Sequence, residues 1–127
     1  MAICVLYAIR VYWFVDLIEF CELPSFTKTY SDIATDEELL ELQMELCENP
    51  EKGELVRGTG GARKVRMRRP GKGKSGGARV IYYWQDEEGV IWLIKAYAKN
   101  VAAELTEKEK KQIAAVIDEI KGSGYEE

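Results

Sequence analysis

The spacing of apolar residues indicates a helix in two parts of the chain. In the first, residues 35–50, leucines recur at helical spacing: Leu39, Leu42 and Leu46. Thr35 and Glu38 form a capping-box pattern, in which each side chain satisfies a free backbone donor at the helix start. The second part opens on the same pattern, Thr106 with Glu109, and its apolar residues also keep helical spacing: Ile113, Val116, Ile117 and Ile120.

Between these helices the period of the pattern falls to two residues, as in β-strands. The segment ARKVRMR, residues 62–68, places its apolar residues on one face and its basic residues on the other. The nearly continuous β-branched and aromatic run ARVIYYWQ, residues 78–85, predicts a central strand. The turn DEEG, residues 86–89, joins it to VIWLIKAY, residues 90–97, so an antiparallel hairpin is expected.

The order of these elements predicts an α+β fold. A strand at residues 17–22 and a short helix at 24–32 are expected first. Because the helices are grouped away from a run of strands, N-terminal helices and a C-terminal helix should pack on a small antiparallel β-sheet. We expect residues 17–121 to form one domain, residues 1–16 to be an N-terminal extension or an extra strand, and residues 122–127 to be a flexible tail.

Composition is typical of a globular protein, with 46% hydrophobic and 31% charged residues. The apolar N-terminal stretch is interrupted by Arg10, Asp16 and Glu19, which argues against a secretory signal or a membrane span. The three cysteines lack a CxxC pattern and the chain has no histidine. We therefore expect reduced thiols, a cytoplasmic location, no metal site and no cofactor.

Charge is distributed unevenly along the chain. The formal net charge is −4, but residues 55–85 carry nine basic residues and no acidic ones. These nine are Arg57, Arg63, Lys64, Arg66, Arg68, Arg69, Lys72, Lys74 and Arg79. A solvated face usually mixes both signs, and nine neighbouring cations repel one another. The pattern therefore favours a polyanion-binding site over a merely solubilising surface.

The glycine-rich segment GKGKSGG, residues 71–77, resembles a phosphate-binding loop at first sight. Such a loop needs a glycine where this chain has Arg68, and a helix must follow so that its amides and dipole attract the phosphates. Here a strand pattern follows, so we reject nucleotide binding. We expect instead a flexible, basic connection between two strands, in which Lys72 and Lys74 contact phosphates.

Three segments, in this order and spacing, resemble the RelE/ParE toxin superfamily, and within it the HigB-like toxins of bacterial type II toxin–antitoxin systems. They are NPEKGELVRGTGGARKVR (49–66), GKGKSGGARVIYYW (71–84) and YAKN (97–100). The resemblance implies a RelE-like α+β fold. It also implies an activity, because RelE-like members are ribosome-dependent endoribonucleases that cut mRNA in the decoding site and halt translation.

Such cleavage uses the RNA 2′-OH as nucleophile on the neighbouring phosphate. The enzyme must help to remove the 2′ proton, stabilise the charge on the phosphate and protonate the 5′ leaving oxygen. This chain has no histidine, and its basic segment has no acidic residue to hold a metal ion. A lysine crowded by cations loses its proton more readily, and arginine binds phosphate bidentately. The hypothesis is a metal-independent general acid/base mechanism.

Four catalytic candidates follow from strand alternation and the resemblance. Lys64 and Arg66 share one face of their strand, about 7 Å apart, and match the basic pair of the RelE pattern. Arg79 matches the phosphate-stabilising arginine, and Lys99 a basic residue near the leaving group. The RNA-binding candidates are Arg63, Arg68, Lys72, Lys74 and Tyr97. Each has a structural alternative, such as a surface cation, a salt bridge or, for Tyr97, packing. The RelE pattern has a tyrosine at the start of the last helix, and this chain, which reads VAAELTE there, has no clear counterpart of it.

Two other functions stay open at this point. One is a ParE-like inhibitor of DNA gyrase with the same fold, and the other is a non-catalytic RNA-binding or ribosome-binding module. The leading hypothesis is a toxin that cleaves mRNA on the ribosome. By the resemblance, its partners are mRNA, the ribosome and a cognate antitoxin, commonly of helix-turn-helix type.

Overall fold

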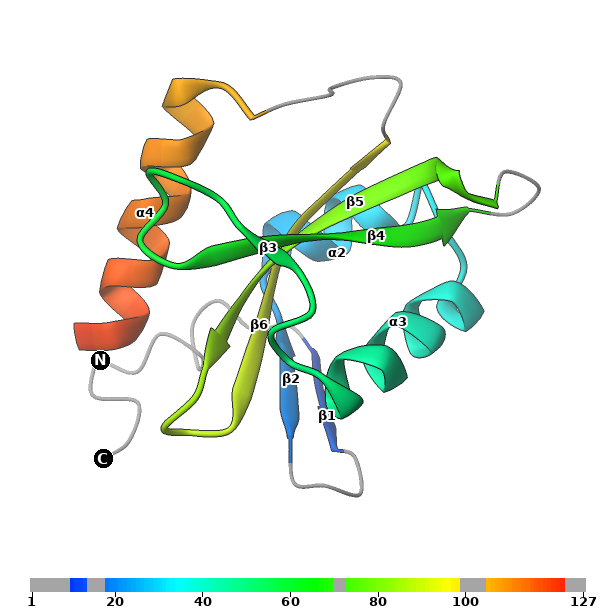
Figure 1. The fold of residues 1–127 in the computed structure, drawn as a ribbon, viewed down its shortest axis with the longest axis horizontal. Coiled ribbons are helices and arrows are strands. Elements are labelled where there is room, and N and C mark those ends of the chain that lie inside the picture. The colour runs from blue at the N-terminus through cyan, green and yellow to red at the C-terminus, as the bar shows by residue number, and fades with distance from the viewer. Residues whose placement is uncertain (1–9, 14–17, 70–72, 99–104, 123–127) are drawn as a thin grey trace.

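The computed structural model describes residues 10–13, 18–69, 73–98 and 105–122, which form a six-stranded sheet flanked by three helices (Figure 1). The strands are β1 (Arg10–Trp13), β2 (Glu19–Glu22), β3 (Glu54–Leu55), β4 (Ala62–Arg69), β5 (Gly73–Gln85) and β6 (Val90–Ala98). The helices are α2 (Pro24–Tyr30), α3 (Asp36–Glu48) and α4 (Glu107–Gly122). In space the strands follow the order β1-β2-β6-β5-β4-β3. The predicted α+β class is confirmed.

One feature of the predicted sheet is wrong, because the sheet is mixed and not wholly antiparallel. β2 runs parallel to β6, with Phe20 opposite Ile91, whereas the other pairings are antiparallel. The strand expected at 17–22 is observed as β2, and β1 pairs with its outer edge. β2 thus lies between β1, the first described strand, and β6, the last strand, within a single sheet.

The predicted helix starts are confirmed. Thr35 accepts a hydrogen bond from the backbone of Glu38, and the Glu38 side chain bonds back to the Thr35 backbone. Thr106 and Glu109 make the same reciprocal pair at the start of α4. The expected short helix near 24–32 is α2, which carries a proline in its first turn, where the missing backbone N–H is not needed.

Helices cover both faces of the sheet, which explains the continuous apolar run of its central strand. Val80 and Tyr82 of β5 pack in one core cluster with Phe26 of α2 and Leu46 of α3. Ile81 turns to the other face and packs in a second cluster, which contains the apolar stripe of α4: Ile113, Ile117 and Ile120. Figure 1 shows α4 well separated from α3, at the opposite end of the view.

The glycine-rich connection differs from the flexible loop that we expected over residues 71–77. β5 begins at Gly73, and Gly73 pairs with Arg69 of β4 after a shift in register. Most of the segment is therefore strand, and residues 70–72 lie outside the described residues. GKSGG is itself the start of β5, so the predicted strand stands where a phosphate-binding loop would need a helix.

Within the described ranges, none of the helices is long and apolar enough to cross a bilayer.

Candidate active site

Strand alternation brings three predicted cations to one side of the sheet. Lys64 and Arg66 of β4 flank Val65, which packs in the core cluster that contains residues of α2 and α3. Both cations therefore project from the opposite face of the sheet. Arg66 is the register partner of Arg79 on β5, and Arg79 in turn is opposite Tyr97 on β6. The face that carries them is the one on which α4 packs, but Arg66 is exposed and Arg79 and Lys64 are half-buried. α4 therefore leaves this part of the sheet accessible.

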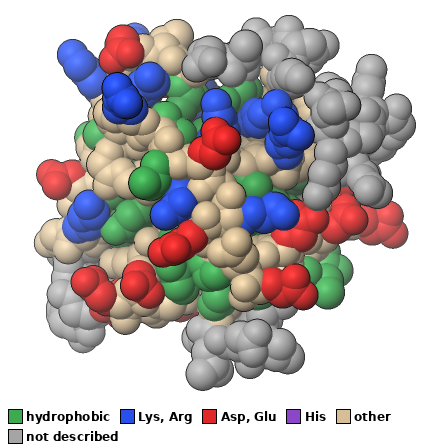
Figure 2. All heavy atoms as spheres, viewed as in Figure 1, with side chains coloured by type: hydrophobic (Ala, Val, Ile, Leu, Met, Phe, Trp, Pro, Cys, Tyr) green, Lys and Arg blue, Asp and Glu red, His purple; other side chains and the backbone are tan. Residues whose placement is uncertain are grey.

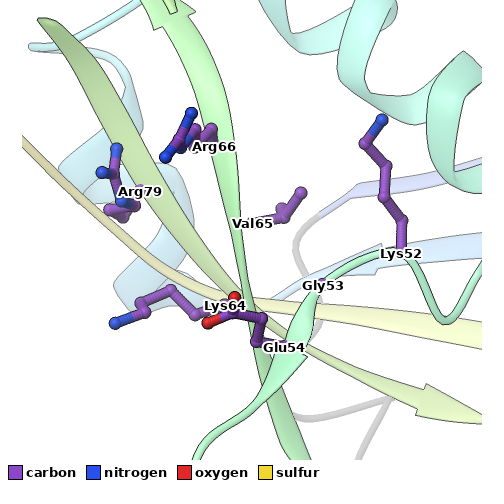
Figure 3. Close-up of a pocket in the computed structure, with 7 residues that line it drawn as sticks. All are labelled: Lys52, Gly53, Glu54, Lys64, Val65, Arg66 and Arg79. Atoms are coloured by element: carbon purple, nitrogen blue, oxygen red, sulfur yellow. The ribbon is translucent and has the colours of Figure 1, made fainter. Parts of the chain in front are cut away.

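A cleft of about 430 Å³ opens beside these side chains, and we call it the cationic cleft. It is lined by Lys52, Gly53, Glu54, Lys64, Val65, Arg66 and Arg79. Figure 3 shows Lys64, Arg66 and Arg79 on one side of β4, with Lys52 on the other side. Four basic residues and one carboxylate give the cleft a formal charge of +3. Such a charge in a concave site attracts anions.

Of the four cations of the cleft, Lys52 lies 3.9 Å from Glu45 Oε1, and the other three are not neutralised by the rest of the described chain. Within the described ranges, Lys64, Arg66 and Arg79 form no ion pair, and Arg79 makes one long hydrogen bond, from Nη1 to the carbonyl of Ala78 at 3.4 Å. Like charges directly opposite each other on neighbouring strands destabilise a sheet. Figure 2 shows most basic side chains on the upper half of the visible face, with some acidic ones among them and several more acidic ones on the lower half. A bound polyanion would relieve the repulsion between Arg66 and Arg79.

Tyr82 positions one wall of the cationic cleft. Its hydroxyl accepts the backbone N–H of Gly53 at 3.0 Å and donates to the carbonyl of Pro50 at 2.7 Å. Tyr82 is fully buried, and burial raises the pKa of its hydroxyl, an effect that the Gly53 hydrogen bond partly offsets. Because both bonds reach the segment between α3 and β3, Tyr82 fixes the backbone that leads into Glu54.

Arg63 supports the same wall from the opposite face to Arg66. Its Nη1 donates to the carbonyls of Gly53 at 2.7 Å and Glu51 at 3.2 Å. The sequence alone suggests Arg63 as an RNA-binding residue. Arg63 neighbours Lys64 along β4, so its side chain points to the opposite face of the strand. This orientation and its two bonds to backbone carbonyls favour a structural role, in which the guanidinium holds the wall of the cleft and does not enter it.

Gly53 is the point of closest approach between this wall and the sheet. A Cβ at Gly53 would lie 2.9 Å from the carbonyl oxygen of Lys64 and 3.0 Å from Cε1 of Tyr82. Both distances are shorter than normal van der Waals contact, so a larger residue would push the wall away from β4. The glycine in NPEKGE thus has a specific packing role.

Glu54 is a site residue that we did not find from the sequence. It precedes the acid-free segment by one residue, so it was not counted with the basic patch. The two-residue strand β3 pairs Glu54 with Lys64 and brings this carboxylate into the cleft. A strand of two residues has no periodic pattern, so only the non-local pairing could have revealed it.

Of the remaining predicted site residues, only Tyr97 has a described side chain. Tyr97 is 7% exposed and packs in the α4 cluster, so its burial favours packing over base stacking. Arg68 lies in β4 and Lys74 in β5, and their side chains lie outside the described part of the chain. Lys72 and Lys99 lie outside the described residues altogether.

The start of α4 is attached to the sheet beside the cleft. Lys95 of β6 donates from Nζ to Glu109 Oε2 at 2.6 Å, and both side chains are 30% exposed. Glu109 also accepts the backbone N–H of Thr106 at 2.9 Å. The Lys95 hydrogen bond, followed by that from Thr106, holds the pKa of the Glu109 carboxyl below its ordinary value. This pair orients α4 relative to β6.

Comparison with known proteins gives a family and a fold for this chain. The family model described as "RelE toxin of RelE / RelB toxin-antitoxin system" matches residues 26–124. Among solved structures, a free-state E. coli RelE toxin with two arginine-to-alanine substitutions superposes with a TM-score of 0.54 at 19% identity. The match covers 85% of this chain and 98% of the E. coli toxin. The structural likeness shows a shared fold.

Proposed function

This chain belongs to the RelE toxin family, and on that premise we propose that it is a ribosome-dependent endoribonuclease that cleaves mRNA and so inhibits translation. Membership of the family makes it a toxin of a toxin–antitoxin system, which implies a cognate antitoxin as partner. The cleavage activity, the dependence on the ribosome and the helix-turn-helix class of the antitoxin are our proposals.

The observation that carries the proposal is the adjacent pair Arg66 and Arg79 in the cationic cleft. The two arginines are register partners, and with Lys64 they line an accessible cleft that holds only one carboxylate among its lining residues. Arginine is the side chain best suited to bidentate phosphate binding. Two arginines on neighbouring strands can contact different oxygens of one phosphate. The arrangement supports stabilisation of a phosphate that gains negative charge during reaction.

The proposed reaction is an internal attack by the RNA. The 2′ oxygen forms a bond to the adjacent phosphorus while the bond to the 5′ oxygen breaks, which leaves a 2′,3′-cyclic phosphate and a 5′-hydroxyl end. Glu54 and Lys64, which are opposite each other on β3 and β4, are the two groups available to accept the 2′ proton. Arg66 and Arg79 stabilise the phosphate, and Lys99 remains our candidate donor to the leaving oxygen. No metal ion is required by this scheme.

The RNA path is proposed to extend beyond the cleft along the β4–β5 hairpin. Arg68 and Lys74 follow Arg66 and precede Arg79 along the two strands, and Lys72 lies in the connection between them. These cations would contact mRNA or ribosomal RNA by charge and not by sequence, as phosphate contacts generally do. Replacement of Lys72 and Lys74 should weaken ribosome association more than the chemical step.

Induced expression in bacterial cells tests the function. The intact toxin should stop protein synthesis and create new 5′ ends within translated mRNA, detected by primer extension. Arg79→Ala should abolish both effects, and Lys108→Ala, which removes an exposed cation from α4, should leave both unchanged. Growth arrest with intact mRNA would refute the proposal, and DNA breaks in those cells would indicate a gyrase inhibitor instead.

A further inference from the structure

A second cleft lies directly beside the cationic cleft. It encloses about 180 Å³ between β3, the segment after it and the start of α4. Glu54 and Lys64 line both clefts, so the two are adjacent. The side chains that distinguish the second cleft are Leu55, Val56, Arg57, Tyr97, Leu105 and Lys110.

The lining of the second cleft combines apolar and basic groups. Leu55 is 65% exposed, an unusual position for a large apolar side chain, and Leu105 is half-buried on the opposite wall. Arg57 is exposed, and Lys110 has a side chain 22% exposed. An apolar surface beside cations suits a nucleotide, because the base offers an apolar face and the phosphate a negative charge. An apolar surface alone, or cations alone, would not indicate a nucleotide as the ligand.

The loop that carries Arg57 is well fixed. The fully buried Thr59 donates from its hydroxyl to the carbonyl of Val56 at 2.7 Å and accepts the backbone N–H of Ala62 at 3.1 Å. Gly58 has a φ of 83°, a left-handed conformation that favours glycine. These interactions fix the backbone of the loop that carries Arg57 before any ligand binds, which reduces the entropy lost on binding.

Lys110 is available to a ligand at low energetic cost. Its Nζ lies 3.7 Å from Glu107 Oε2, but Glu107 is 85% exposed, and an exposed pair of this kind contributes little to stability. The stem of Lys110 passes near Gly58, where a Cβ would lie 3.8 Å from its Cδ. The ammonium group therefore projects from α4 near the same loop that presents Arg57.

We propose that the second cleft binds the nucleotide adjacent to the scissile phosphate, a subsite that rests on the function proposed above. Leu55 and Leu105 contact the base, and Arg57 and Lys110 contact its flanking phosphate. One RNA strand then passes from the Arg66–Arg79 pair through the shared Lys64 into the second cleft. Leu55 thereby becomes a determinant of base preference beside the cut.

Direct binding tests the subsite without depending on cleavage. The purified full chain is titrated into a fluorescein-labelled, single-stranded octamer RNA with 2′-O-methyl groups, which cannot be cleaved, at graded KCl concentrations. Lys110→Gln combined with Arg57→Gln should reduce the slope of log K against log salt by about 0.7, the contribution of one phosphate contact on a single strand, and each single variant should reduce it by part of that amount. Lys108→Gln, an equal charge change on the exposed surface of α4, should leave the slope unchanged.

Leu55→Ser should keep the slope and weaken binding about threefold, because one apolar contact with a base is lost. Urea midpoints like that of the parent would show that each variant is folded. The subsite is refuted if Lys110→Gln and Lys108→Gln behave alike, or if the parent does not bind the octamer. Loss of mRNA cleavage in cells with normal octamer binding would instead refute the proposed reaction and leave the subsite standing.

Discussion

Arg66 and Arg79 face each other across the antiparallel β4–β5 ladder, on the side of the sheet where α4 packs. Their neighbours Val65 and Val80 are also register partners and lie in the core on the other side. The alternation that builds the core therefore also places two arginines together. Because the described chain supplies no counter-ion for this pair, the free protein holds a repulsive contact that an anionic ligand would remove.

Removing one of these charges should separate stability from activity. Arg66→Gln should raise the free energy of unfolding by about 0.5 kcal/mol, since a like-charge pair across strands is lost. The same variant should lose mRNA cleavage. Urea denaturation at low salt measures the first effect. A loss of stability of more than about 1 kcal/mol would show that Arg66 has a structural role instead.

Gly53→Ala should destabilise the wall of the cationic cleft. The added methyl group would meet the Lys64 carbonyl at 2.9 Å, so the wall must move and the free energy of unfolding should fall by about 1–3 kcal/mol. Gly122→Ala is the matched control, because among the described residues no atom lies within 4 Å of a Cβ there. Thermal unfolding of the two variants provides the comparison, and equal midpoints would contradict the close approach.

Tyr82→Phe should reveal an alkaline dependence of stability. Loss of the hydroxyl leaves the Gly53 N–H and the Pro50 carbonyl unpaired, so the variant should be less stable by about 2 kcal/mol at neutral pH. Burial raises the pKa of Tyr82 above its ordinary 10.0, so the folded state holds the phenol proton more tightly than the unfolded state. The stabilisation of the folded state by this tighter proton binding is complete below pH 10.0, and it is lost as pH rises toward the raised pKa.

The stability advantage of the parent over Tyr82→Phe should therefore shrink above pH 10.0. Urea titrations of both proteins at several alkaline pH values measure this difference directly, and lysine deprotonation cancels because both proteins share it. An advantage that stays constant through the alkaline range would contradict a buried, hydrogen-bonded Tyr82 hydroxyl.

The Lys95–Glu109 pair should produce an acid dependence of the opposite sign. The Lys95 hydrogen bond lowers the pKa of Glu109 from 4.5, so its stabilisation is present above pH 4.5 and is lost as pH falls toward the lowered pKa. Glu109→Gln preserves the helix cap but loses the ion pair, at about 0.5–1 kcal/mol for a partly exposed site. The difference between the parent and Glu109→Gln should shrink below pH 4.5. A difference independent of pH would show that the pair contributes nothing.

Local patterns predicted most of the fold correctly. The Thr35–Glu38 cap and the strand around Val80 depend on residues close together in the chain. Such local patterns can be recognised in the sequence alone. The parallel pairing of β2 with β6 joins Phe20 to Ile91, and no local pattern encodes a partner so distant. The central strand, expected over residues 78–85, is longer than expected, because β5 already begins at Gly73 despite the glycines that follow.

The candidate site was predicted in part. Alternation correctly placed Lys64 and Arg66 on one face. The same alternation places Arg63 on the other face, so the sequence contained a reason to separate it from the RNA-binding set. Glu54 was missed because its place in the site depends on the pairing of β3 with β4 at Lys64. A strand of two residues is too short to show a periodic pattern in the sequence.

Mapping of mRNA 5′ ends after induction is the sharpest test of our proposal that the cationic cleft cleaves mRNA on the ribosome. New 5′ ends should appear inside translated messages within minutes for the parent and for Lys108→Ala, and none should appear for Arg79→Ala expressed at the same level. Intact messages in cells arrested by the parent toxin, or equal cleavage by Arg79→Ala, would contradict it.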